Sequence, residues 1–298
     1  MKKFLFILSF FVLVFSSTGA MAFSLSAQSA ILIDGATGEV IYEKNADKKM
    51  PMASTTKIMT AICTTENINS NVPIRVNSDA AGIEGSSIYL KAGEKITIKE
   101  LLCGMLLNSG NDAATALALE VAGSVEKFSE IMNKTAIKIG ANSTNFKNSS
   151  GLYDENHYTT ARDLAKIAAY AMENPLIRWI VGLKEIKISN DGKGLRYLKN
   201  HNKLLWQYEG CTGIKTGYTK KCGRCLVSSA KRGSKELIAV TLNAPDDWRD
   251  HKILFDYGFK DENTPSSPAS SGKENLPVKD VFTVLLNLTS KFLFTPLK

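Results

Sequence analysis

Histidine is scarce in this chain, with three residues among 298. They are His157, His201 and His251, and none lies near a G-x-S-x-G sequence, the turn that exposes the nucleophile of α/β-hydrolases. A Ser–His–Asp hydrolase is therefore disfavoured. We expect the three histidines to be surface or capping residues.

Cysteine is also infrequent, and the total of five argues against a framework built only of disulfides. Cys63 and Cys103 lie in apolar helical patterns and are predicted to be plain core residues. Cys222 and Cys225 form a C-x-x-C sequence without a second pair or a nearby histidine, so a metal site is disfavoured. A disulfide or redox role stays open for this pair, beside the alternative of two unrelated strand residues.

Basic residues exceed acidic ones, with 37 Lys and Arg against 29 Asp and Glu and a formal net charge of +8. The lysines are scattered, without a polybasic block or interleaved aromatic residues, so we expect no nucleic-acid partner. A mildly basic exported protein would instead favour an anionic wall or membrane surface.

The N-terminus has the three parts of a secretory signal peptide. Lys2 and Lys3 precede an apolar run over 4–15, and small residues follow as far as Ala22. We predict a signal peptide at residues 1–22 and an exported protein at the cell wall or the outer face of the cytoplasmic membrane. A retained anchor is the alternative, but the run is shorter than the about 20 residues that a spanning helix needs.

The order of the expected elements predicts an α/β fold of the α+β type. Two strands around a Gly-rich turn are expected at 29–45, and further strands gather between residues 185 and 243, with helices in between. This order fits an antiparallel sheet assembled from both ends of the chain and flanked by helices. The expected helices are 53–66, 97–107, 112–122, 125–139, 159–172 and 248–257, and the later strands are 185–189, 213–217, 225–231 and 236–243.

The composition changes after Lys260. Residues 261–277 are rich in Ser, Pro and charge and are predicted to form a flexible linker. Residues 278–298 are apolar, and a helix of about 14 residues there would span about 21 Å, less than the about 30 Å of a hydrocarbon core. This segment is expected either to lie as an amphipathic anchor in the membrane interface or to pack on the domain.

Ser54 and Lys57 stand three residues apart at the expected start of a helix, so both lie on one face. Covalent acyl transfer needs a nucleophile, a base within hydrogen-bond reach and donors for the developing oxyanion. Burial and the positive end of the helix would both oppose a charge on Lys57, and the neutral amine could then take the Ser54 proton. The same S-x-x-K spacing occurs at 124–127, 228–231 and 270–273, so spacing alone does not identify the site.

Two further motifs favour the first copy. Ser109 and Asn111 stand in an N-S-G-N turn between two expected helices. Lys215, Thr216 and Gly217 form a K-T-G sequence that occurs once, in a strand-like run. Because neighbouring strand residues alternate faces, the Lys and the Thr could both reach a substrate only from an edge strand or a twisted one. The glycine would let a substrate backbone approach closely.

In this order the three motifs resemble those of penicillin-binding proteins and serine β-lactamases. The middle motif is S-G-N, and the sequences MASTTKIMTA, LLNSGNDAA, NHYTTARDLA and GIKTGYT are similar to the serine-type D-alanyl-D-alanine carboxypeptidases of peptidase family S11, the low-molecular-mass penicillin-binding proteins. The resemblance covers about residues 25–258. It implies a transpeptidase-like fold with a helical subdomain, a catalytic domain at 23–260, and no metal or organic cofactor.

The resemblance also implies a role for each motif. Ser54 would attack the carbonyl of the penultimate D-alanine of a peptidoglycan stem peptide, with Lys57 as the general base. Ser109 and Asn111 would relay a proton and position the substrate amide. β-Lactams would be trapped as acyl-enzymes. The substrate carboxylate would be bound by Lys215 and Thr216, with Gly217 beside it, and the oxyanion by the backbone N–H groups of Ser54 and Tyr218.

Two other functions remain open. A serine β-lactamase shares the acylation machinery but deacylates quickly, and class A enzymes do so with an additional Glu in an E-x-x-L-N context, which residues 66–70 and 155–159 do not supply. A catalytically silent protein that only binds peptidoglycan or β-lactams is the other alternative. Family members commonly carry a β-rich second domain before a C-terminal anchor, and the residues after Lys260 are too few for one, which leaves membrane attachment open.

Overall fold

The computed structural model describes residues 24–260. The chain divides into two units, residues 1–260 and 261–298, and the second lies outside the described part. The predicted signal peptide, linker and C-terminal anchor also lie outside the described residues. Within residues 24–260, no helix is both long enough and apolar enough to cross a membrane.

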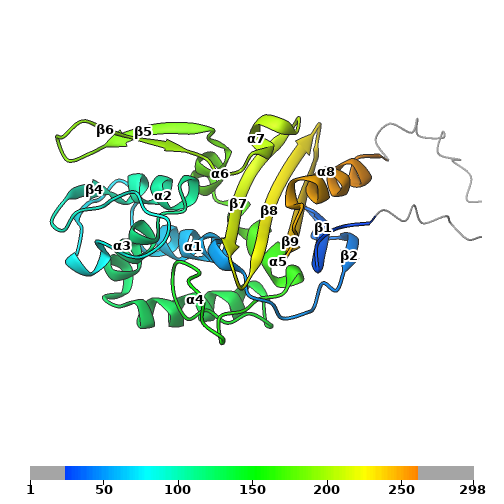
Figure 1. Cartoon of the computed structure of the whole chain (residues 1–298), viewed down its shortest axis with the longest axis horizontal. Helices are drawn as coiled ribbons and strands as arrows, with labels where there is room; N and C mark the ends of the chain where they lie inside the picture. The colour runs from blue at the N-terminus through cyan, green and yellow to red at the C-terminus, as the bar shows by residue number, and fades with distance from the viewer. Residues whose placement is uncertain (1–23, 261–298) are drawn as a thin grey trace, which may run out of the picture. The chain divides into compact units, whose positions relative to one another are not determined.

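A five-stranded antiparallel sheet forms the centre of the described unit, with the strand order β2-β1-β9-β8-β7 (Figure 1). The prediction of a sheet built from both ends of the chain is therefore confirmed. Strand β7 ends the order, so one of its edges is left without a partner in this sheet. The strands are β1 (Ser29–Asp34), β2 (Val40–Lys44), β7 (Cys211–Thr219), β8 (Gly223–Arg232) and β9 (Lys235–Leu242).

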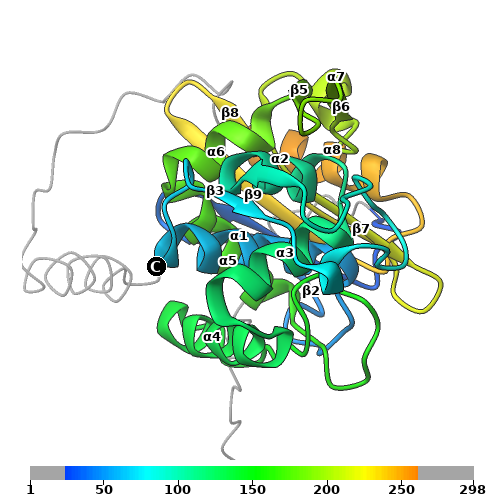
Figure 2. The same ribbon diagram turned by 90° about the vertical axis from the view of Figure 1, so that its left-hand side faces the viewer.

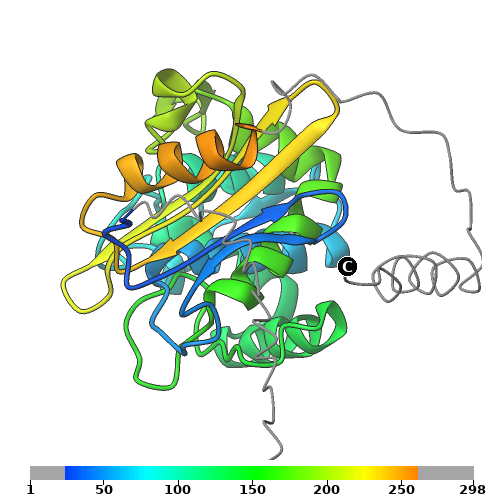
Figure 3. The ribbon, with the colours of Figure 1, turned by 90° about the vertical axis from the view of Figure 1, so that its right-hand side faces the viewer.

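The sheet separates two apolar cores, because successive side chains of a strand point to opposite faces. In β1, Ile31 and Ile33 join the larger core with the helices of one face, whereas Ala30 and Leu32 join a smaller core with helix α8 (Asp247–Gly258). Figure 3 shows α8 lying across its face of the sheet.

All six expected helices are present, and all of them except α8 pack on the larger-core side of the sheet (Figure 2). The prediction for 125–139 matches both ends of α4, and the first turn of the helix expected at 53–66 is a 3-10 helix, η1. The sequence did not predict α6, which has eight residues, or α7, which has four. The helices are η1 (Ala53–Thr56), α1 (Lys57–Asn67), η2 (Ser78–Ala80), α2 (Ile98–Leu107), α3 (Asn111–Ala122), α4 (Val125–Ile139), α5 (Ala161–Glu173), α6 (Pro175–Gly182) and α7 (Leu204–Gln207).

Two short hairpins lie outside the main sheet. Strand β5 (Glu185–Ser189) was expected, but it pairs with the unpredicted β6 (Leu195–Lys199) rather than with the later strands. Strands β3 (Pro73–Arg75) and β4 (Lys95–Thr97) form the other hairpin, and at three residues each they are too short to give a clear alternating pattern.

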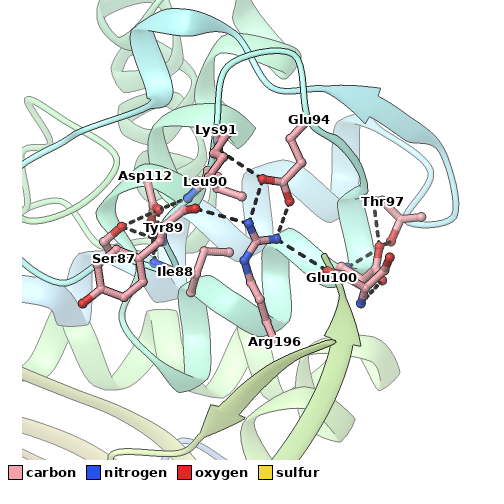
Figure 4. Close-up of polar contacts among 11 residues, drawn as sticks. Ser87, Ile88, Tyr89, Leu90, Lys91, Glu94, Thr97, Glu100, Asp112 and Arg196 are labelled. Atoms are coloured by element: carbon pink, nitrogen blue, oxygen red, sulfur yellow. Dashed lines mark hydrogen bonds and ion pairs between the residues drawn. The ribbon is translucent and has the colours of Figure 1, made fainter. Parts of the chain in front are cut away.

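A buried ion pair fixes the β5–β6 hairpin to the loop before β4. Arg196 of β6 donates to both carboxylate oxygens of Glu94, with Nη2 2.7 Å from Oε2, and also to the carbonyl of Tyr89 (Figure 4). The two side chains are 10% and 4% exposed. Glu94 also accepts the backbone N–H of Lys91, so the pair satisfies several buried polar groups at once.

We expect Glu94→Gln to lower the free energy of unfolding by about 3 kcal/mol, because it leaves the Arg196 charge buried without its counterion. Urea unfolding followed by circular dichroism measures the loss. The matched control is Glu43→Gln, which breaks an ion pair with Arg162 at a carboxylate that is 50% exposed and should cost less than about 1 kcal/mol. Equal losses in the two variants would contradict this account.

Candidate active site

The edge strand β7 packs against η1, and this contact places the K-T-G sequence beside Ser54. A Cβ on Gly217 would lie 3.1 Å from Met52 O and 3.1 Å from Ser54 N. Glycine therefore suits this position because protein backbone approaches it closely, whereas the sequence predicted the approach of a substrate backbone. Beside this contact lies a cleft of about 780 Å³ whose lining includes Ser54, Ser109, Lys199, Thr216, Gly217 and Tyr218.

Lys57 is the first residue of α1 and is fully buried. Its Nζ lies 3.0 Å from Ser54 Oγ, 2.7 Å from Asn111 Oδ1 and 2.6 Å from Ser150 O. Amide and peptide carbonyl oxygens can only accept hydrogen bonds. A neutral amine can therefore direct its two N–H bonds to these oxygens, which leaves its lone pair facing the hydroxyl of Ser54.

The electrostatic surroundings favour that neutral form. Burial first, and the charge of Lys215 second, hold the pKa of Lys57 well below its usual range, and the carboxylate of Asp112 opposes this shift in part. Ser54 itself is half-buried and opens onto the cleft. The arrangement can move a proton from the hydroxyl to the amine when an electrophile enters.

The S-G-N turn contributes two side chains with different contacts. Asn111 begins α3, and its side chain accepts from Lys57 Nζ and donates from Nδ2 to Glu84 O at 2.7 Å. Both ends of the amide are therefore engaged by protein. Ser109 has φ = 62°, which is uncommon for a residue other than glycine, and its Oγ accepts a hydrogen bond from Lys215 Nζ at 3.1 Å.

The K-T-G residues divide between the buried face and the cleft. Lys215 is buried, and burial lowers its pKa to about 7; its Nζ donates to Ser109 Oγ and to Thr216 O. Thr216 lines the cleft, and the side chain of Tyr218 is exposed at its mouth. For Lys215 and Thr216 both to reach a substrate, the sequence pattern required an edge strand or a twisted one. Strand β7 is an edge strand, because it ends the sheet.

Sequence reasoning missed the loop that supplies the third contact of Lys57. The carbonyl of Ser150 precedes Gly151, which has φ = 84° and where a Cβ would collide with Ala53 O. The Asn148 side chain shapes this turn by accepting from the Ser150 and Gly151 N–H groups. An N-S-S-G sequence is typical of a turn, but only the tertiary structure brings this one to Lys57.

A second missed group is His157, which was expected at the surface or at a helix cap but is buried. Its Nδ1 accepts from Lys147 N, so Nε2 carries the proton and donates to Thr56 Oγ1 at 2.7 Å. Thr56 in turn donates to Ala53 O, the carbonyl immediately before Ser54. Burial lowers the pKa of His157 to about 4, so this supporting chain of hydrogen bonds contains a neutral imidazole.

The other two histidines differ in their burial. His251 is buried between α8 and the sheet, with its ring nitrogens bonded to Ser228 and Thr241, and burial lowers its pKa to about 3. His201 lines the cleft, and burial followed by the charge of Lys215 lowers its pKa. The expectation of surface or capping residues was therefore wrong for His157 and His251.

The competing S-x-x-K copies do not form an equivalent pair among residues 24–260. Ser124 is the N-cap of α4 and accepts from the backbone N–H of Lys127. Ser228 is hydrogen-bonded to His251 instead of to a lysine. The copy at 270–273 lies outside the described residues.

The cysteines behave largely as expected. Cys63 and Cys103 are buried core residues, as predicted. Cys225 lies in β8, whereas Cys222 lies in the turn before it, so the alternative of two strand residues holds for Cys225 alone. Both thiols are free and buried, and burial raises the pKa of Cys225 to about 12. A thiol that is hard to deprotonate is poorly reactive.

The comparisons with known proteins agree on one family. Residues 16–246 match the family model of peptidase S11, D-alanyl-D-alanine carboxypeptidase. The D-alanyl-D-alanine carboxypeptidase DacF of Bacillus subtilis is 40% identical over 223 residues, which are 73% of this chain and 57% of the relative. This chain thus spans little more than half the length of that protein. The D-alanyl-D-alanine carboxypeptidase of Streptomyces sp. strain K15 is 34% identical over 79% of this chain and 88% of the relative.

The solved structures lead to the same conclusion. The crystal structure of the Streptomyces K15 DD-transpeptidase matches with a TM-score of 0.75 and 33% identity, over 79% of this chain and 98% of that one. The expected transpeptidase-like α+β fold is therefore confirmed. The chain belongs to the S11 family of D-alanyl-D-alanine carboxypeptidases.

Proposed function

We propose that this chain is a serine D-alanyl-D-alanine carboxypeptidase that removes the terminal D-alanine of peptidoglycan stem peptides through an acyl-enzyme on Ser54. Membership of the S11 family supports the substrate class and the reaction. The observation that carries the proposal is the buried amine of Lys57, held 3.0 Å from Ser54 Oγ by two acceptors that cannot donate.

In the acylation step, Lys57 takes the Ser54 proton as Oγ bonds to the carbonyl carbon of the penultimate residue. The backbone N–H groups of Ser54 and Tyr218 stabilise the oxyanion. The bond to the terminal D-alanine then breaks, and its amine takes up the proton, relayed through Ser109. Water hydrolyses the ester and restores the hydroxyl.

The terminal carboxylate of the substrate binds beside Thr216, near the cation of Lys215. Because burial lowers the pKa of Lys215 to about 7, an arriving carboxylate would favour its protonated form. Asn111 acts mainly by orienting Lys57, since both ends of its amide are already engaged. Gly217 serves by admitting η1 next to the strand.

A β-lactam would acylate Ser54 in the same way and leave slowly. Rapid release needs a base for the hydrolytic water, as in class A β-lactamases. Among the described residues that line the cleft, the one carboxylate is Asp247, and it pairs with Arg224 at 2.8 Å. This favours a long-lived acyl-enzyme adduct over the rapid deacylation that is typical of a β-lactamase.

Intact-protein mass spectrometry after benzylpenicillin, followed over time, tests the reaction class. We expect a stable adduct on the wild type and none on Ser54→Ala or Lys57→Ala, since one lacks the nucleophile and the other its base. Release of D-alanine from a pentapeptide should vanish in both variants. Adduct loss within seconds would indicate a β-lactamase, whereas binding without D-alanine release by the wild type would indicate a silent binding protein.

A separate variant tests the neutral amine. Asn111→Asp places a carboxylate where Oδ1 lies 2.7 Å from Lys57 Nζ, which should raise the pKa of Lys57 by about 1 to 3 units. The acidic limb of the pH profile of acylation should then move to higher pH, with about 10- to 100-fold slower acylation at pH 7. Asn111→Ala is the control, because it removes the acceptor without adding charge. An unmoved acidic limb in Asn111→Asp would reject Lys57 as the base.

We further propose that residues 1–22 direct export, that residues 23–260 form the catalytic domain, and that 261–277 link it to a membrane-interface anchor at 278–298. This proposal is based on the signal-peptide pattern of residues 1–22, the Ser- and Pro-rich composition of 261–277 and the apolar composition of 278–298. Fractionation of cells that express the full chain or a chain ending at residue 277 tests the anchor. We expect only the full chain in the membrane fraction and a mature N-terminus at Phe23; identical fractionation of both chains would exclude the anchor.

A further inference from the structure

The cleft beside Ser54 carries positive charge that the protein does not neutralise. Its lining includes Lys199, Lys203 and Arg224, and among the described lining residues the acidic one is Asp247, which pairs with Arg224. Neither lysine is within ion-pair distance of a carboxylate in the described part of the chain. Two ammonium groups are therefore available to a ligand.

The position of Lys199 is fixed close to the S-G-N turn. Its backbone N–H donates to Asn108 Oδ1 at 3.0 Å, one residue before Ser109. The N–H of His201 donates to Leu107 O at 3.2 Å, which ties the end of β6 to the last turn of α2. The Arg196–Glu94 pair fixes the start of β6 (Figure 4), so the strand that ends at Lys199 is anchored at both ends.

Lys203 and Trp206 belong to an equally well-anchored element. In α7, Leu204 and Leu205 are buried, and the side chain of Asn202 accepts the Leu204 N–H. Lys203 and Trp206 remain exposed and line the cleft. Lys199 Nζ lies 5.7 Å from the centre of the Trp206 ring, so the ammonium of β6 is directed towards α7.

We propose that Lys199 and Lys203 form a subsite for a second carboxylate of the stem peptide, on the acyl side of the scissile bond. This inference rests on the proposed function, in which Lys215 and Thr216 bind the terminal carboxylate. The leaving group is a single D-alanine and fills only a small part of a cleft of about 780 Å³, so the remaining lining faces the acyl portion. Trp206 offers an apolar wall for the aliphatic part of an acidic side chain.

Two peptides that end in D-alanyl-D-alanine test the subsite when they differ only in an upstream side chain, a free carboxylate in one and its carboxamide in the other. For the wild type we expect a higher kcat/KM with the acid, and a preference that weakens as salt is added. Lys199→Gln and Lys203→Gln should each reduce kcat/KM for the acid about 3-fold, and the double variant about 10-fold. The amide should be hydrolysed at an unchanged rate by all of them.

Lys187→Gln is the matched control, because Lys187 is an exposed lysine of the same hairpin, opposite Tyr197, and does not line the cleft. It should leave both rates unchanged. Equal losses for acid and amide in the double variant, or no loss for either, would overturn the subsite. Labelling of the variants by benzylpenicillin reports the Ser54 chemistry separately. If the wild type hydrolyses neither peptide, the proposed function fails, and competition of each peptide with benzylpenicillin labelling still decides the acid preference.

Discussion

The burial of one amine is the constraint on which the rest of the site depends. A lysine without contact to water is costly to keep charged, and Lys57 is fully buried with a pKa well below its usual range. Its neighbours suit the neutral form, since Asn111 and Ser150 offer only oxygen acceptors and Ser54 offers a hydroxyl. Three distant stretches of chain must therefore meet at one nitrogen atom.

Close backbone packing brings the segments that carry Lys57, Asn111 and Ser150 together. The first turn of the helix is held between β7 and the loop that ends at Gly151. A side chain at Gly151 would collide with this turn, and one at Gly217 would contact it tightly. The neutral His157 supports the same turn through Thr56. Ala53 and Ser109 both adopt positive φ values next to the site, which is the kind of local strain that surrounding structure must support. The geometry around Ser54 is thus a property of the packing around η1.

Polar contacts extend from this centre to the outer wall of the cleft. Asp112, next to Asn111, is buried and accepts from Ser87, Ile88 and Leu90, which orders the loop that also meets Arg196 (Figure 4). The buried Arg196–Glu94 pair then joins this loop to the β5–β6 hairpin. Groups that contact Lys57 and groups that line the cleft are thereby connected through a short series of polar contacts, some of them fully buried.

The sequence by itself determined the long elements, the sheet drawn from both ends of the chain, and the three motifs, because periodicity and short-range spacing are local properties. It did not reveal β3, β4, β6 or the short helices, whose patterns are too brief. The tertiary structure alone decided which S-x-x-K pair is buried beside an edge strand, that Ser150 and His157 belong to the site, and that Gly217 admits protein backbone. Those outcomes depend on contacts between residues about 50 to 160 positions apart, which no local pattern encodes.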